Sequence, residues 1–255
     1  MYKLNNVKVK RGGRVILDID KLTIEDNQFT VILGHNGSGK STLVNLLSDQ
    51  FSPDQGSVLL NNRPVKQYSA KALAKTVAYL PQQLPNVAGL NVEELVRLGR
   101  YPWRGVLGRW NHQDRDIILE AMKQTGVETY AKHIADQLSG GEKQRAWVAM
   151  LLAQQSQILI LDEPTSALDI RHQYQLMALL QRLNKQTGRG IIVIIHDLNL
   201  ALRYANRVVA LNKGKVAFEG DVSLLANETL LSDLYSTPVK LVDHPTQDGK
   251  VAVIC

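Results

Sequence analysis

Apolar residues in this chain occur in short runs separated by polar turns. The runs at 31–33, 158–161 and 191–195 consist of Ile, Val and Leu. Runs of this length and composition are typical of parallel strands that are buried on both faces. Residues 1–9 alternate between apolar and polar positions like a half-buried strand, and residues 42–47 are amphipathic. The pattern predicts an α/β fold.

The length of 255 residues allows one large α/β domain with an inserted subdomain. Residues 1–82 and 153–225 carry the predicted strands and form the core. Residues 83–152 have a helical pattern and are interpreted as the inserted α-helical subdomain. Residues 226–255 form a small C-terminal tail.

The segment after the strand at 31–33 has the composition of a phosphate-binding loop. Its residues are Gly34, His35, Asn36, Gly37, Ser38, Gly39, Lys40, Ser41 and Thr42. Glycines let the backbone curl around a β-phosphate at the N-terminus of a helix, where free N–H groups and the helix dipole favour negative charge. Lys40 can reach the β- and γ-phosphates, and the Ser41 hydroxyl can bind Mg²⁺. A strand before the loop and an amphipathic run after it make a chance glycine-rich turn a poor alternative.

Two carboxylates follow the apolar run at 158–161 directly. Asp162 is expected at the end of a buried strand, where it can hold Mg²⁺ through water, and Glu163 can take a proton from an attacking water. The alternative is a pair of exposed acids that open the turn at Pro164. Four apolar residues that run straight into the acids favour the buried site.

The element Ser139, Gly140, Gly141, Glu142 stands ahead of this strand. Together with the phosphate loop it resembles the nucleotide-binding subunit of ABC transporters over nearly the whole chain. The resemblance implies a P-loop NTPase, RecA-like core with an N-terminal antiparallel β subdomain and an α-helical insertion, and ATP and Mg²⁺ as ligands. Ser139, Gly140 and Gly141 would cap the γ-phosphate bound by a second copy, so that hydrolysis needs a head-to-tail homodimer. Ser139 also reads as a helix N-cap with Glu142 at the third helical position, and both interpretations can hold.

Three further residues match the family pattern one by one. Gln82 matches the glutamine that contacts Mg²⁺ and the attacking water, and Asp169 belongs to the loop that crosses the dimer interface. His196, after the run at 191–195, matches the histidine that bonds the γ-phosphate. Taken alone, Gln82 reads as a surface amide and His196 as a core histidine. Their order and spacing favour the family roles.

One expected residue is missing. The family usually stacks an aromatic ring on adenine from the turn near the N-terminus, but Arg11 occupies that position here, ahead of Gly12 and Gly13. Its guanidinium plane can stack on the base instead. The alternative is a solvated arginine in a β-turn, and both stay open.

Composition limits the remaining possibilities. The longest apolar run, 146–153, is far shorter than the roughly 18 residues of a membrane span, and residues 1–9 carry no apolar signal core. The single Cys255 offers no internal disulfide or metal cluster. Basic residues behind the net charge of +6 are interspersed with acids and include no nucleic-acid-binding motif. We expect a peripheral protein on the cytoplasmic face of a bacterial inner membrane, with no nucleic-acid partner.

Residues 99–110 place Tyr101, Trp103, Trp110 and three arginines in a predicted loop. Aromatic residues and arginines are enriched at interface hot spots, so the loop is a candidate docking site for an integral membrane permease. In the alternative interpretation, the tryptophans only pack the helical subdomain.

Segments 77–85, 99–109, 144–150 and 161–170 resemble the ATPases of the bacterial iron-siderophore and vitamin B12 importers, above all the ferric hydroxamate type. This implies a periplasmic or lipoprotein siderophore-binding protein as an indirect partner. Another iron chelate, haem or vitamin B12 stays open as cargo. A soluble ABC ATPase of translation or DNA repair would carry two cassettes or a long heptad insertion, and neither is visible. A regulatory module without turnover would be expected to lack Glu163, Ser139 or His196, and all three are present.

Overall fold

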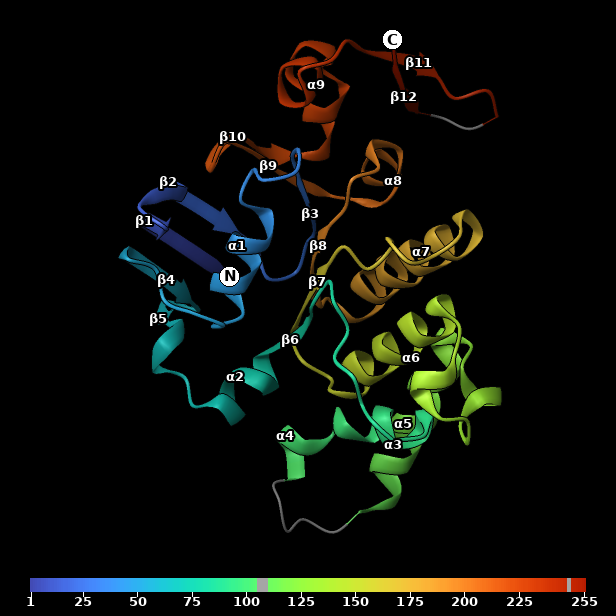
Figure 1. Ribbon diagram of the computed structural model, residues 1–255. Helices are drawn as coiled ribbons and strands as arrows, with labels where there is room; N and C mark the ends of the chain where they lie inside the picture. Colours follow the sequence, from blue (N-terminus) through green and yellow to red (C-terminus); the bar gives the residue numbers. More distant parts are fainter. Residues whose placement is uncertain (105–109, 247–248) are drawn as a thin grey trace. The chain divides into compact units, whose positions relative to one another are not determined.

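The computed structural model describes residues 1–104, 110–246 and 249–255, and it divides into two compact units (Figure 1). The first unit combines residues 1–67 with 190–255, and the second covers 68–189. The sequence predicts different boundaries, after residues 82, 152 and 225. These boundaries stay a prediction.

The strands before residue 222 in the first unit belong to two sheets. β1 (Tyr2–Arg11) pairs antiparallel with β2 (Arg14–Ile24) and β4 (Gln55–Leu60), and β5 (Arg63–Pro64) pairs with β4. β3 (Phe29–Leu33) is parallel to β8 (Gly190–Ile194) and β9 (Arg207–Asn212), and β10 (Lys215–Asp221) pairs antiparallel with β9. Every residue of β3 and β8 is buried, as the uninterrupted apolar runs predict.

Helices and a hairpin complete this unit. α1 (Lys40–Leu47) follows β3, and α8 (Leu198–Tyr204) follows β8. Short 3-10 helices cover Val65–Gln67 and Val222–Ala226. The predicted C-terminal tail holds α9 (Glu228–Tyr235) and an antiparallel hairpin of β11 (Val239–Asp243) and β12 (Lys250–Ile254).

The second unit is mainly helical. Its parallel strands are β6 (Val77–Leu80) and β7 (Ile158–Asp162). α3 (Val92–Leu98), α5 (His112–Thr125) and α6 (Gly140–Ala153) pack together (Figure 1). The remaining elements are α2 (Ala70–Thr76), α4 (Tyr101–Arg104), α7 (Ile170–Thr187) and 3-10 turns at Glu128–Tyr130 and Ala135–Gln137.

Polar caps explain where the long helices of this unit begin and end. Asn111 caps α5, Ser139 caps α6 and Asp169 caps α7 by accepting hydrogen bonds from N–H groups of the first turn. α5 and α7 end at Gly126 and Gly188, both left-handed with φ near 65°.

The sheets and helices of the two units confirm the predicted α/β fold with an antiparallel β part and a helical part.

Two sequence expectations need comment. The interpretation of residues 99–110 as a loop is wrong in part, because Tyr101–Arg104 forms α4; residues 105–109, including Arg109, lie outside the described residues. Within the described ranges, no helix is both long and apolar enough to cross a membrane.

Candidate functional site

The segment between β3 and α1 follows a path that glycines make possible. Gly34, Gly37 and Gly39 have φ angles of 143°, 78° and 103°. A Cβ on Gly34 would lie 2.3 Å from the Leu211 carbonyl oxygen, and a Cβ on Gly39 would lie 2.9 Å from Leu17 Cδ1. Side chains at these two positions would therefore displace the loop. The loop leads into the N-terminus of α1, where among the described residues no side chain caps the helix at Gly39, a position that favours an anion.

Two buried polar groups indicate what this loop holds. Lys40 is 4% exposed, and its Nζ donates to the Gly34 carbonyl at 2.9 Å and to the His35 carbonyl at 3.1 Å. The Ser38 hydroxyl is buried and has no hydrogen-bond partner among the described residues. An unsatisfied buried hydroxyl costs about 1–3 kcal/mol. The Lys40 ammonium group enclosed by the loop and the unpaired Ser38 hydroxyl can both bind the phosphate groups of a nucleotide.

Gln82 and Glu163 meet at the ends of two paired strands. In the parallel register of β6 and β7, Leu80 lies opposite Leu161. Gln82 and Glu163 each follow these residues by two positions, so they lie close to each other. Gln82 Nε2 donates to Glu163 Oε2 at 2.7 Å. This contact brings together the predicted water-binding amide and the predicted base.

The backbone at Glu163 is unusual. Its φ of 49° is left-handed, which costs a non-glycine residue on the order of 1–3 kcal/mol. The Ser166 N–H and hydroxyl donate to the Glu163 carbonyl at 3.2 and 3.0 Å and hold this turn. Such strain is typical of positions that aim a functional side chain.

Asp162 stands immediately before this turn as the last residue of β7. It is 4% exposed, which agrees with the buried acid that the sequence predicts. Burial, and then the charge of Asp162, raise the pKa of Tyr79 to about 12. Tyr79 therefore stays protonated beside the carboxylate at physiological pH. The alternative of two exposed acids is wrong for Asp162.

Ser139 occupies the N-cap of α6 in a complete capping box. Its N–H and hydroxyl donate to Glu142 Oε2 at 2.9 and 2.7 Å, and Glu142 N–H donates back to the hydroxyl at 3.4 Å. Hydrogen bonds from Tyr130 and then Ser139 lower the pKa of Glu142 to about 2. The helix-cap interpretation is confirmed, and the phosphate-clamp interpretation of Ser139, Gly140 and Gly141 stays a prediction.

Asp169 and His196 both stand at helix starts. Asp169 caps α7, accepts from the His172 N–H at 2.9 Å and lies 2.8 Å from His172 Nδ1. The backbone and side-chain hydrogen bonds of His172 lower the pKa of Asp169. His196 precedes the N-cap Asp197 of α8, and its side chain is exposed. The interpretation of His196 as a core histidine is therefore wrong.

Arg11 has an aromatic partner within its own unit. It ends β1 opposite Arg14, across a turn at Gly12 and Gly13. Its Cζ lies 4.5 Å from the centroid of the Phe51 ring. A Cβ on Gly39 would lie 3.1 Å from the Ile16 carbonyl oxygen, which places the phosphate loop against β2 near this turn. The arginine is thus more than a solvated turn residue.

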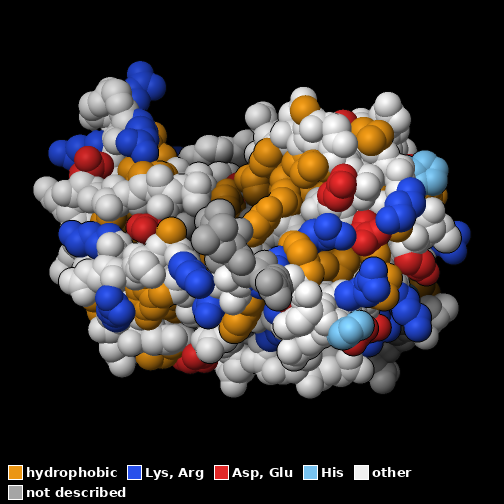
Figure 2. Space-filling model, turned by 90° about the horizontal axis from the view of Figure 1, so that it is seen from below, with side chains coloured by type: hydrophobic (Ala, Val, Ile, Leu, Met, Phe, Trp, Pro, Cys, Tyr) orange, Lys and Arg blue, Asp and Glu red, His pale blue; other side chains and the backbone are white. Residues whose placement is uncertain are grey.

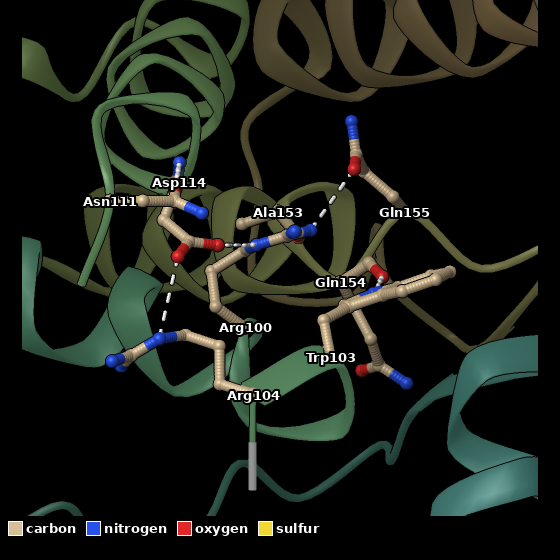
Figure 3. Close-up of polar contacts among 8 residues, drawn as sticks. All are labelled: Arg100, Trp103, Arg104, Asn111, Asp114, Ala153, Gln154 and Gln155. Carbon is tan, nitrogen blue, oxygen red and sulfur yellow. Dashed lines mark hydrogen bonds and ion pairs between the residues drawn. The ribbon is translucent and has the colours of Figure 1, made fainter. Parts of the chain in front are cut away.

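A buried ion-pair network anchors the segment at 99–104 (Figure 3). Asp114 Oδ1 accepts from Arg100 Nε at 3.0 Å, and Asp114 Oδ2 lies 3.4 Å from Arg104 Nε. Arg100 also donates to the Ala153 carbonyl and to Gln155. Because both arginine side chains are only 7% exposed, the prediction that they present themselves to a partner is wrong.

The aromatic residues of this segment remain partly accessible. Tyr101, Trp103 and Trp110 are 51%, 41% and 43% exposed. Trp103 Nε1 donates to the Gln154 carbonyl at 2.6 Å, with Lys75 Nζ 4.7 Å from its ring centroid. Internal contacts thus hold Trp103, while part of its ring stays exposed. The packing interpretation is confirmed for Trp103, and the docking interpretation stays a prediction.

Three residues of these networks were missed by the sequence analysis. Asp114 resembles any acid in a first helical turn, which the helix dipole favours in any case. Phe51 and Tyr130 stand far along the chain from Arg11 and Glu142, and no periodicity links either pair. Only a comparison of related sequences could have linked the two residues of each pair.

Comparisons with known proteins agree with this geometry. The family model described as ABC transporter matches residues 17–166. The chain is 40% identical over 242 residues to the iron(3+)-hydroxamate import ATP-binding protein FhuC of Bacillus subtilis, with 95% of this chain and 90% of that protein covered. It is also 40% identical over 251 residues to the ferric enterobactin transport ATP-binding protein FepC of Escherichia coli, covering 95% and 93%.

A solved structure is similar as well. The dimeric structure of MJ0796, a bacterial ABC transporter cassette, superposes with a TM-score of 0.79 at 32% identity. The match covers 87% of this chain and 99% of that one.

Proposed function

Since this chain belongs to the ABC transporter family as its ATP-hydrolysing subunit, we propose that it powers uptake of an iron(III)-siderophore complex of the hydroxamate type across a bacterial inner membrane. The observation that carries the hydrolytic role is the Gln82–Glu163 hydrogen bond at the ends of β6 and β7. Likeness to FhuC over nearly the whole chain supports the cargo. The equal identity to FepC makes another iron chelate the second candidate.

Hydrolysis takes place in a head-to-tail homodimer. The loop from Gly34 to Thr42 holds the phosphates of ATP, with Lys40 neutralising charge and His196 bonding the γ-phosphate. Glu163 accepts a proton from the attacking water that Gln82 orients, while Ser139, Gly140 and Gly141 of the second copy close over the γ-phosphate. Phosphoryl transfer depends on such positioning and charge neutralisation more than on covalent chemistry. ATP-driven closure moves the permease, and hydrolysis reopens the dimer.

Mg²⁺ fits the oxygen donors that the chain offers. Ser41, Gln82 and Asp162 supply a hydroxyl, an amide oxygen and a carboxylate, which are the hard ligands that this ion prefers. Within the described ranges, no group of three or more His, Cys, Asp or Glu could hold a metal alone. Mg²⁺ is commonly bound through one or two carboxylates together with the phosphates of a nucleotide, and Asp162 would be the carboxylate here. When bound, Mg²⁺ supplies neutralisation of phosphate charge.

The partners follow from the transport role. The subunit binds an integral membrane permease on the cytoplasmic face of the inner membrane and acts indirectly with a periplasmic or lipoprotein siderophore-binding protein. Deleting the gene tests the cargo: uptake of radiolabelled ferric hydroxamate should be lost and uptake of ferric enterobactin retained. The reverse pattern would assign the cargo to the second candidate.

We expect Arg11 to cover the adenine base. The guanidinium lies over the Phe51 ring, and the phosphate loop contacts β2 beside the turn. Arg11→Ala should weaken ATP binding by about 0.5–2 kcal/mol, the range for a cation–π contact, and Arg11→Tyr should restore it. Titration with a fluorescent ATP analogue measures the effect, with Arg63→Ala as an exposed control. Unchanged affinity in Arg11→Ala would remove Arg11 from the site.

The exposed aromatic residues of α4 are proposed as a permease contact. Figure 2 shows hydrophobic side chains gathered beside Lys and Arg side chains on the face seen from below. Replacing Tyr101 and Trp103 together with Ala should leave the basal ATPase activity within a few-fold, because neither is a phosphate ligand, and should abolish permease co-purification and uptake.

Two outcomes would contradict this docking assignment. A variant that folds and supports full uptake would place the contact elsewhere. A collapsed thermal transition would instead favour a packing role. Trp103→Phe then serves as a milder variant, because it keeps an aromatic side chain, although a smaller one, and removes the hydrogen bond to Gln154.

A further inference from the structure

Two grooves of similar size in the helical unit are both lined by basic residues, but they differ in whether an acid shares the wall. One, here called the α5–α7 groove, has a volume of about 500 Å³ and is lined by the end of α5, one side of α6 and α7. The other, of about 540 Å³, lies along α3 and α5. Both volumes fall within the range of about 300–1,000 Å³ that small ligands occupy.

In the second groove two of the basic residues share one acid, and Arg115 lines the groove as a third. Glu93 forms ion pairs with Arg97 at 3.3 Å and with Lys132 at 2.6 Å. The Arg97 guanidinium also lies 4.9 Å from the Trp110 ring centroid. The positive charge of this groove is therefore compensated in part by an acid in its own wall.

In the α5–α7 groove the positive charge is not neutralised. Lys123, Arg145, His172 and Arg182 line it, and no acid does so among the described residues. Lys123 and Arg182 are exposed and make no ion pair or side-chain hydrogen bond within the described part of the chain. Arg145 interacts with Glu142 at longer range, and Asp169 holds the His172 ring. At least two cations thus face the groove without compensation.

The floor of the same groove is apolar. Val148 of α6 and Leu176 and Leu179 of α7 are buried beneath it. His172, Leu176, Leu179 and Arg182 follow helical spacing along one stripe of α7, so Arg182 stands at one end of an apolar stretch. Lys123 and Arg145 line the same groove from α5 and α6. A ligand that matches this surface combines an apolar or planar body with negative charges at its ends.

We propose that the α5–α7 groove binds a small organic anion that carries two or more negative charges on an apolar body, of roughly the size of a mononucleotide. This site is separate from the phosphate loop, which belongs to the other compact unit. Arg145 and Ser139 lie on the same helix, so an occupied groove contacts the helix that carries the proposed phosphate clamp. The proposal does not depend on the cargo or on the transport role.

Naphthalene-1,5-disulfonate is a suitable probe, because it has a planar body, two charges and no phosphate. Isothermal titration of the full chain at low salt should show one saturable site. Arg182→Glu and Lys123→Glu should each raise the dissociation constant about tenfold or more, since each replaces attraction with repulsion. Lys185→Glu, an exposed charge reversal on α7 outside the groove, and Lys40→Ala in the phosphate loop should change it less than about twofold.

Several results would overturn this assignment. Loss of binding in Lys40→Ala would move the site to the phosphate loop. An equal loss in Lys185→Glu would reduce the effect to general charge attraction. Sulfate that binds as tightly as the disulfonate would show that the apolar floor contributes nothing. No saturable binding to the unmodified chain would exclude the site.

Discussion

Replacing Glu163 with Gln should lower ATP turnover on the order of 10²- to 10⁴-fold while ATP still binds and traps a dimer. The substitution keeps the shape of the side chain and its distance from Gln82, which is 2.7 Å between Nε2 and Oε2. It removes the negative charge of the carboxylate and with it the ability to accept a proton from water. Phosphate release measures turnover, and size-exclusion chromatography with ATP and Mg²⁺ measures the trapped dimer.

The effect should be specific to this carboxylate. Glu128→Gln, an exposed acid of the same unit, should keep normal turnover. Lys40→Ala should weaken ATP binding itself, because the buried ammonium is lost from the loop. Near-normal hydrolysis by Glu163→Gln would rule out Glu163 as the base.

Asp114→Asn should destabilise the protein strongly. The change leaves Arg100 and Arg104 as buried cations without the carboxylate that they share. Breaking a buried ion pair in this way costs about 3–5 kcal/mol. Urea titration of the free energy of unfolding measures the loss, and the melting temperature should fall by about 2–4 °C for each kcal/mol.

Asp116→Asn is the matched control for this change. It alters the same chemical group in the same helix, but Asp116 is exposed, so its effect should stay within about 0.5 kcal/mol. If the two substitutions destabilise the protein equally, the buried ion pairs add no stability. The effect of Asp114 would then be only that of an acid in the first turn of a helix.

The strand ends were the part of the site that the sequence predicted best. An apolar run that stops at Asp162 or Gln82 marks the end of a buried strand, and parallel register then brings the following residues together. The glycines of the phosphate loop were equally informative, because positive φ angles and close backbone approach exclude other residues. These features depend on local rules that a short segment obeys by itself.

The network around Asp114 could not be predicted from the sequence, because it joins residues that are distant along the chain. Arg100 reads as a surface residue until α5 and α6 fold back on it, and it then bonds Asp114 and the Ala153 carbonyl from two other helices. The contact between Arg11 and Phe51 likewise joins the end of a strand to a loop beyond α1. Such long-range pairs depend on the tertiary fold and not on local pattern.

The proposed dimer is tested most directly by mixing two inactive variants, Ser139→Arg and Glu163→Gln. If Ser139 acts on the nucleotide of the second copy, a mixed dimer has one site with both lesions and one site with neither. The mixture should then hydrolyse ATP about tenfold or more faster than either variant alone, since the intact site escapes a loss on the order of 10²-fold or greater. A mixture no more active than its parents would contradict clamping between two copies.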